Sequence, residues 1–205
     1  MFRIFVDTCV WRHWFTYRSG GGSDMPTRLS QHCDHFQIIY DRVVAVPTHA
    51  RFLYNQLVKD ELGNSFEDDF VAKVLPVSEK IPIPLTRFDG AYRYGDSILH
   101  GGELGGTLRA LLSMYGYPHE EALKQAADAL TEGKFLYETT ARKKEFDIEH
   151  MESALEARAH LFLTDDESTI LKRLRDASPK YHEAHPINAI CRIAMTPTEA
   201  AHIQW

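Results

Sequence analysis

Two short apolar runs, one near each end of the chain, lead directly into carboxylates, and this repeated pattern most constrains the fold. Residues 2–6 are mostly apolar, aromatic or β-branched and lead into Asp7, and residues 160–163 lead towards Asp165 and Asp166. Side chains of this kind favour short buried strands. In open α/β sheets, ligand sites form beyond the carboxyl ends of the strands. The sequence therefore predicts acidic side chains gathered at one edge of a sheet.

A third segment places another acid on a helix that directly follows a strand. Residues 51–54 read as a strand, and Asn55 is a suitable N-cap for a helix over residues 56–62. Gly63 is a typical residue for the end of that helix. Glu61 lies in its last turn.

The rest of the chain alternates between helical patterns and short apolar segments. After a glycine-rich break at 19–23, the patterns predict helices at 29–43, 103–115, 119–131, 147–157 and 167–175, a last apolar segment at 189–195 and a short terminal helix. Strands that alternate with helices predict a three-layer α/β/α fold with a mostly parallel central sheet. The length favours a single domain over residues 1–205, with a helical and loop insertion at about 74–140.

Composition bears on where in the cell the protein is expected and on the redox state of its cysteines. The chain has 205 residues, of which 44% are hydrophobic and 25% charged, and no apolar run approaches the roughly 20 residues of a membrane-spanning helix. The N-terminus lacks the features of a signal peptide, so we expect a cytoplasmic protein with no membrane partner. The cysteines, Cys9, Cys33 and Cys191, show no CxxC spacing and are expected to be reduced thiols that bind no zinc.

The formal net charge of −6 argues against broad, nonspecific adhesion to nucleic acid, because such adhesion depends on lysine and arginine displacing counterions from phosphates. It does not argue against a nuclease. Carboxylates pooled to hold cations make the protein acidic, while the metal-loaded site still attracts a phosphodiester. Mg²⁺ and Mn²⁺ prefer such oxygen ligands, and neighbouring carboxylates repel one another unless a cation neutralises them.

Each acid has a simpler interpretation when it is taken alone. Asp7 is as typical of a turn or helix cap as of a metal ligand, and Glu61 is more often a solvated helix residue. The case depends on the set and on its order along the chain.

Four segments, in the same order, resemble the PIN-domain ribonuclease family. Residues 5–11 (FVDTCVW) are similar to its opening motif, a strand that ends in Asp-Thr. Residues 52–62 resemble its strand, polar cap and Glu-bearing helix. Residues 147–155 and 160–166 resemble its long signature, an Asp that opens a helix followed by an apolar strand and Thr-x-Asp. Residues 191–200 resemble its closing strand and Thr-Pro-x-Glu helix.

The resemblance implies a ribonuclease that uses Mg²⁺ or Mn²⁺, acts on single-stranded or structured RNA and leaves a 5′-phosphate and a 3′-hydroxyl. The residues that it marks as catalytic and as metal ligands are Asp7, Glu61, Asp147 and Asp166. Spacing assigns Asp166, rather than Asp165, to the last acidic position.

Neighbouring residues have supporting roles in this interpretation. Hydroxyls and a carboxylate beside the ligands would fix their orientation, and these residues are Thr8, Thr164 and Asp165. Two basic groups would contact phosphates that flank the scissile one, although a solvated charged face is the more ordinary role for such residues. The first group is Arg142, Lys143 and Lys144, and the second is Lys172, Arg173 and Arg175. His150 is interpreted as structural.

Other functions stay open. A PIN-like module with weak catalysis would bind RNA or a protein instead, and a protein regulator of the antitoxin type and a homodimer are both compatible with the family. A phosphatase of the haloacid dehalogenase type also begins with an acid at a strand end, but it needs a second acid two residues later, where this chain has Cys9.

Overall fold

The computed structural model describes residues 1–82 and 140–205, with side chains in the second range from residue 146. Within these residues, five strands form one sheet in the order β3-β2-β1-β4-β5, and every neighbouring pair is parallel. The strands are β1 (Phe2–Val6), β2 (Ala50–Tyr54), β3 (Ser78–Lys80), β4 (Leu161–Leu163) and β5 (Ala194–Met195).

Helices connect the strands, as a parallel sheet requires. The α-helices are α1 (Thr8–Arg18), α2 (Thr27–Ala45), α3 (Gln56–Leu62), α4 (Glu67–Asp69), α8 (Thr140–Glu156), α9 (Lys172–Ala177), α10 (Pro186–Ile193) and α11 (Pro197–Ala200). Shorter 3₁₀ turns cover Gly21–Asp24, Asn64–Phe66, Leu75–Val77 and Ser178–Lys180, and π-helical segments cover Phe70–Val74 and Glu167–Leu171.

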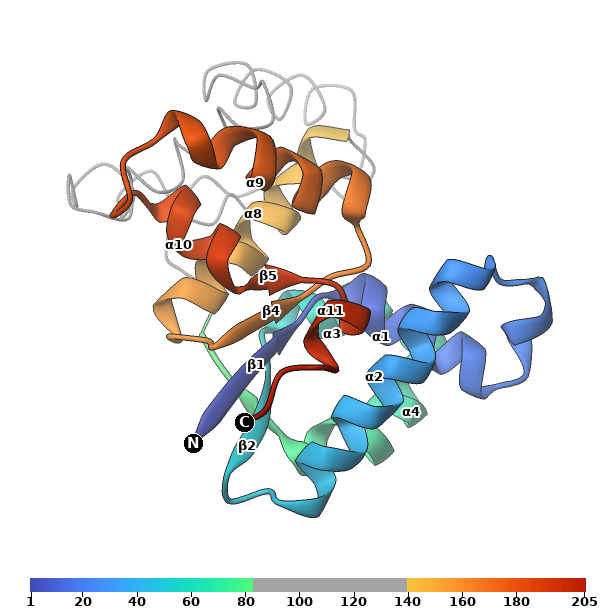
Figure 1. Ribbon diagram of the computed structural model, residues 1–205. Coiled ribbons are helices and arrows are strands. Elements are labelled where there is room, and N and C mark those ends of the chain that lie inside the picture. Colours follow the sequence, from blue (N-terminus) through green and yellow to red (C-terminus); the bar gives the residue numbers. More distant parts are fainter. Residues whose placement is uncertain (83–139) are drawn as a thin grey trace, which may run out of the picture.

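The fold class is α/β, as predicted. Figure 1 shows α8, α9 and α10 on one side of the sheet and α1 and α2 on the other, an arrangement compatible with three α/β/α layers. Residues 78–80, which fall inside the predicted insertion at about 74–140, form the edge strand β3 of the same sheet. The helices predicted at 103–115 and 119–131 lie outside the described residues.

The central strands are apolar because helices cover both of their faces. Phe5 on β1 and Phe162 on β4 are fully buried, and their rings stack with centroids 5.6 Å apart. On α1 and α2, Trp11 meets Phe36 edge to face at 5.0 Å. This core fixes the ends of β1 and β4, and so it fixes the position of the polar residues that follow them.

Two sequence-based expectations about helices were wrong. Asp147 does not open its helix, because α8 begins at Thr140, and the residues between them include good helix formers and no glycine or proline. The apolar segment at 189–195 is mostly the helix α10, with only Ala194 and Met195 in β5. A short apolar run does not by itself distinguish a buried helix from a strand.

Within residues 1–82 and 140–205, the other predicted boundaries agree with the structure to within a few residues. None of the helices in the described residues has an apolar stretch of the length needed to cross a lipid bilayer. Cys9, Cys33 and Cys191 are free thiols.

Candidate active site

The acidic residues lie where the order of the strands reverses. From β1 the chain moves outward through β2 to β3, and it then returns to place β4 on the other side of β1. Ligands of open α/β sheets bind at this kind of switch point, beyond the carboxyl ends of the strands. The backbone N–H of Asp7 donates to the carbonyl of Leu163 at 2.9 Å, so the ends of β1 and β4 are held side by side.

Asp7 occupies the N-cap position of α1 but makes no side-chain capping bond. Its carboxylate instead accepts hydrogen bonds at Oδ2 from the Thr164 hydroxyl at 2.7 Å and the Cys9 thiol at 3.1 Å. The side chain is buried, and this burial raises the pKa of Asp7, with the charge of Glu61 adding to the effect and that of His150 opposing it. The capping interpretation therefore does not describe this residue.

Glu61 is presented by α3, whose ends agree with the sequence. The Asn55 side chain accepts from the Val58 N–H at 3.1 Å, and Gly63 takes a left-handed φ of +63° after the last turn. The Thr8 hydroxyl donates to Glu61 Oε2 at 2.6 Å. Two of the segments that the sequence marked as acidic therefore meet where α1 and α3 come together.

His150 is the second partner of Glu61 and the main functional side chain that sequence reasoning undervalued. Its Nε2 lies 2.8 Å from Glu61 Oε2, and its side chain is 1% exposed. Burial lowers the pKa of His150, but the hydrogen bond and charge of Glu61 outweigh burial and raise that pKa to about 9. The same pairing holds the pKa of Glu61 below its ordinary value, although burial acts in the opposite direction. An imidazolium–carboxylate pair therefore stands among the acids.

Asp147 lies one turn before His150 on α8. Burial raises the pKa of Asp147 well above its ordinary value, and the negative charges of Asp7, Asp166 and Glu61 add to this, while His150 opposes it. Four carboxylates from four separate segments therefore act on one another electrostatically. The one-turn spacing of Asp147 and His150 was the signal in the sequence that could have drawn attention to the histidine.

Asp165 and Asp166 have different surroundings. Asp166 caps the π-helical segment, where its Oδ1 accepts from the Thr169 N–H at 2.7 Å. Asp165 lies between His13 and His32, whose Nδ1 atoms are 2.8 and 2.9 Å from its two oxygens. Burial raises the pKa of Asp165, yet the two histidines outweigh this and lower it. Asp166, and not Asp165, is the residue whose charge acts on Asp147.

The basic side chains predicted to contact substrate, Arg142, Lys143 and Lys144, lie in the first turns of α8. Their side chains are outside the described residues.

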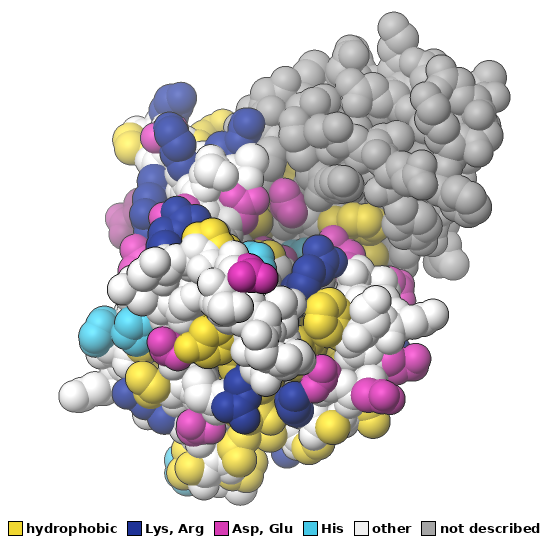
Figure 2. Space-filling view, turned by 90° about the vertical axis from the view of Figure 1, so that its right-hand side faces the viewer, with side chains coloured by type: hydrophobic (Ala, Val, Ile, Leu, Met, Phe, Trp, Pro, Cys, Tyr) yellow, Lys and Arg dark blue, Asp and Glu magenta, His cyan; other side chains and the backbone are white. Residues whose placement is uncertain are grey.

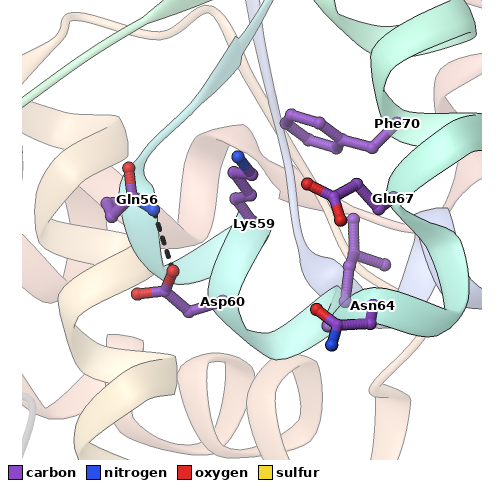
Figure 3. Close-up of a pocket in the computed structure, with 8 residues that line it drawn as sticks. Gln56, Lys59, Asp60, Asn64, Glu67 and Phe70 are labelled. Atoms are coloured by element: carbon purple, nitrogen blue, oxygen red, sulfur yellow. Dashed lines mark hydrogen bonds between the residues drawn. The ribbon is translucent and has the colours of Figure 1, made fainter.

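A pocket of about 360 Å³ lies beside α3 but does not include Glu61 (Figure 3). Its wall on the helix is formed by Gln56, Lys59 and Asp60, and the Gln56 amide donates to Asp60 at 2.8 Å. The pocket mixes both charges and none of the four acids lines it. We do not assign the chemistry to it.

No protein-family model, curated protein or solved structure matches the chain.

The donor set fits a hydrated hard cation better than a soft metal. Burial and the neighbouring Asp7 carboxylate raise the pKa of Cys9 well above its ordinary value, so the thiol stays protonated and does not act as a thiolate ligand. In residues 1–82 and 146–205, no three His, Cys, Asp or Glu side chains are placed to hold a metal ion together. Mg²⁺, however, usually keeps several waters and takes one or two protein carboxylates, which Asp7 and Asp147 can supply.

Proposed function

We propose that this protein is a PIN-like, Mg²⁺- or Mn²⁺-dependent nuclease that hydrolyses phosphodiester bonds in RNA. One observation carries the proposal: the buried carboxylate of Asp7 and the half-buried carboxylate of Asp147 each have a raised pKa, and the charges of neighbouring acids disfavour the ionised form of both. Such carboxylates need a proton or a cation. A divalent cation meets this need at neutral pH and attracts a phosphate at the same time.

The residues of the site have separate roles in the proposed reaction. Asp7 and Asp147 hold the cation, directly or through water, and Asp166 completes the acidic edge from the end of β4. A bound cation lowers the pKa of a water and stabilises the charge that develops on the phosphate. The hydroxyl of Thr164 keeps Asp7 in one orientation through its 2.7 Å bond, and the carboxylate of Asp165 is bound by two histidines.

Glu61 is assigned to the attacking water. Both Thr8 and His150 bind its Oε2 atom, so the carboxylate is fixed in place and its Oε1 atom is the one assigned to orient the water. The positive charge on His150 keeps Glu61 ionised in this arrangement.

The test is cleavage of labelled single-stranded and structured RNAs with Mn²⁺ or Mg²⁺, with EDTA as the metal-free condition. Wild type is compared with Asp7→Asn and Asp166→Asn, and Asp60→Asn is the matched control, because Asp60 is an exposed carboxylate next to Glu61 that binds Gln56. Cleavage by wild type and the control but not by the two site variants supports the proposal. Equal cleavage by all four proteins, or cleavage that persists in EDTA, would refute it.

A second candidate is a PIN-like module that binds RNA or protein and has little catalysis. The observation that favours it is the pair of the buried His150 with Glu61, because an imidazolium already supplies positive charge where a cation would otherwise be needed. Under this candidate, His150→Gln would increase affinity for Mn²⁺ and wild type would bind RNA without cutting it.

A further inference from the structure

A second polar surface of the molecule, next to the acidic edge, forms a basic groove on α9 and the 3₁₀ turn that follows it. The groove has a volume of about 480 Å³. Its polar lining consists of Ser168, Lys172, Arg173, Asp176, Lys180 and Tyr181.

The charge of this groove is opposite to that of the whole chain. Three cations, Lys172, Arg173 and Lys180, face one carboxylate, Asp176, whereas the chain carries a net charge of −6. Lys172 pairs with Asp176 along the helix and remains 66% exposed, so its ammonium group is accessible to a ligand. Figure 2 shows dark blue side chains gathered on the upper left of the molecule, at the height of α9. A local excess of positive charge attracts anions.

The groove begins where the acidic edge ends. Ser168, which lines the groove, lies two residues after Asp166, and its hydroxyl is 3.3 Å from Asp166 Oδ1. The π-helical segment Glu167–Leu171 therefore connects the two surfaces, with the acids at its start and Lys172 just beyond its end. A nucleic-acid strand that has one phosphate at the acids can continue along the groove.

The far end of the groove is aromatic. Tyr181 lines it, and the ring of Tyr181 stacks on His185 with centroids 4.1 Å apart, which fixes the orientation of the tyrosine. A second pocket of about 390 Å³ shares Tyr181 with the groove and is also lined by Arg192. Basic grooves interrupted by aromatic rings are suited to single strands, whose phosphates meet the cations and whose bases stack on the rings.

We infer that this basic groove binds the phosphates of a single polynucleotide strand that flank the phosphodiester held at the acidic edge. The inference rests on the proposed function and adds the path of the substrate to it. Lys172 and Lys180 contact two phosphates, and Tyr181 provides a surface for one base.

The test is binding of a 12-nucleotide single-stranded RNA and of the same sequence as DNA, measured by fluorescence anisotropy in EDTA at several salt concentrations. The variant is Lys172→Gln/Lys180→Gln. The matched control, Lys59→Gln/Lys80→Gln, removes the same charge from exposed lysines near α3 and β3, on the other half of the sheet.

Each phosphate contact on a single strand contributes about 0.7 to the slope of log affinity against log salt. Loss of two contacts should therefore reduce the slope by about 1.4 and the affinity at 0.1 M salt by about 25-fold, for RNA and DNA alike. The stronger of the two wild-type affinities identifies which strand the groove serves. A groove variant that matches the control in slope and affinity, or a wild type that binds neither strand, would overturn the inference.

The failures of the two proposals can be told apart. If wild type binds the strand through Lys172 and Lys180 but never cleaves it, the proposed nuclease activity is refuted and the inference about the groove stands. If wild type cleaves the strand and the groove variant cleaves it with the same KM, the inference about the groove is refuted and the proposed nuclease activity stands.

Discussion

Replacement of His150 by glutamine should remove a pH-dependent part of the folding free energy. His150 has a pKa of about 9 in the folded protein against an ordinary value of 6.5, because it pairs with Glu61 at 2.8 Å. A group with a raised folded pKa stabilises the protein fully below its unfolded pKa, and this contribution is lost as the pH rises through the folded pKa. The relevant window therefore runs from about pH 6.5 to about pH 9.

The size of the effect follows from the two pKa values. One pH unit of difference corresponds to about 1.36 kcal/mol, so the full contribution is about 3 kcal/mol. This is an upper limit, since the Glu61 side chain is 28% exposed and water screens the pair in part. The stability difference between wild type and His150→Gln should be largest at pH 6 and should shrink by about 2–3 kcal/mol by pH 9.5.

The assay is urea denaturation of both proteins at half-unit intervals across this range. His202→Gln is the matched control, because His202 is exposed and lies outside the acidic edge. The midpoint of the His150 ring signal in an NMR titration of wild type should fall near pH 9. A stability difference that does not change between pH 6 and pH 9.5, or an NMR midpoint near 6.5, would refute the ion pair.

Three further predictions concern the same edge of the sheet. Asp147→Asn should raise the stability of the metal-free protein at pH 7, because the folded state disfavours the ionised carboxylate; urea denaturation that gives a lower stability would contradict this. Asn55→Ala should cost about 2–3 kcal/mol in the same assay, through loss of the helix cap and of the 3.0 Å bond to Ser153, and a loss under about 0.5 kcal/mol would count against it. Cys9 and Cys33 should react with iodoacetamide at pH 8 far more slowly than free cysteine, since burial raises both pKa values, that of Cys33 to about 12; labelling at the free-cysteine rate in the native protein would show otherwise.

Local signals predicted those parts of the fold that local residues decide. The limits of α3 follow from its cap and its glycine, and β1 follows from a run of five residues whose last three are buried. The start of α8 was missed because residues 140–146 are largely charged and show no apolar spacing from which a boundary can be inferred. The identity of α10 was missed because an eight-residue apolar segment suits a strand as well as a buried helix.

The site also has parts that the sequence could predict and parts that it could not. The positions of Asp7 and Asp166 could be predicted, because each follows a strand and the ends of parallel strands meet at one edge. The pairing of Glu61 with His150 could not, since the two residues are 89 positions apart and meet only when α8 packs near α3. The histidines that bind Asp165 are as distant, and sequence spacing contains no information about that contact.

The central claim is that the acids at the carboxyl edge of the sheet hold a divalent cation, and titration calorimetry with Mn²⁺ at pH 7 tests it most directly. Wild type and the control Asp60→Asn should bind Mn²⁺ with the same affinity and stoichiometry, and Asp7→Asn and Asp147→Asn should each lose that binding. Wild type that takes up no Mn²⁺, or site variants that bind it as wild type does, would contradict the account.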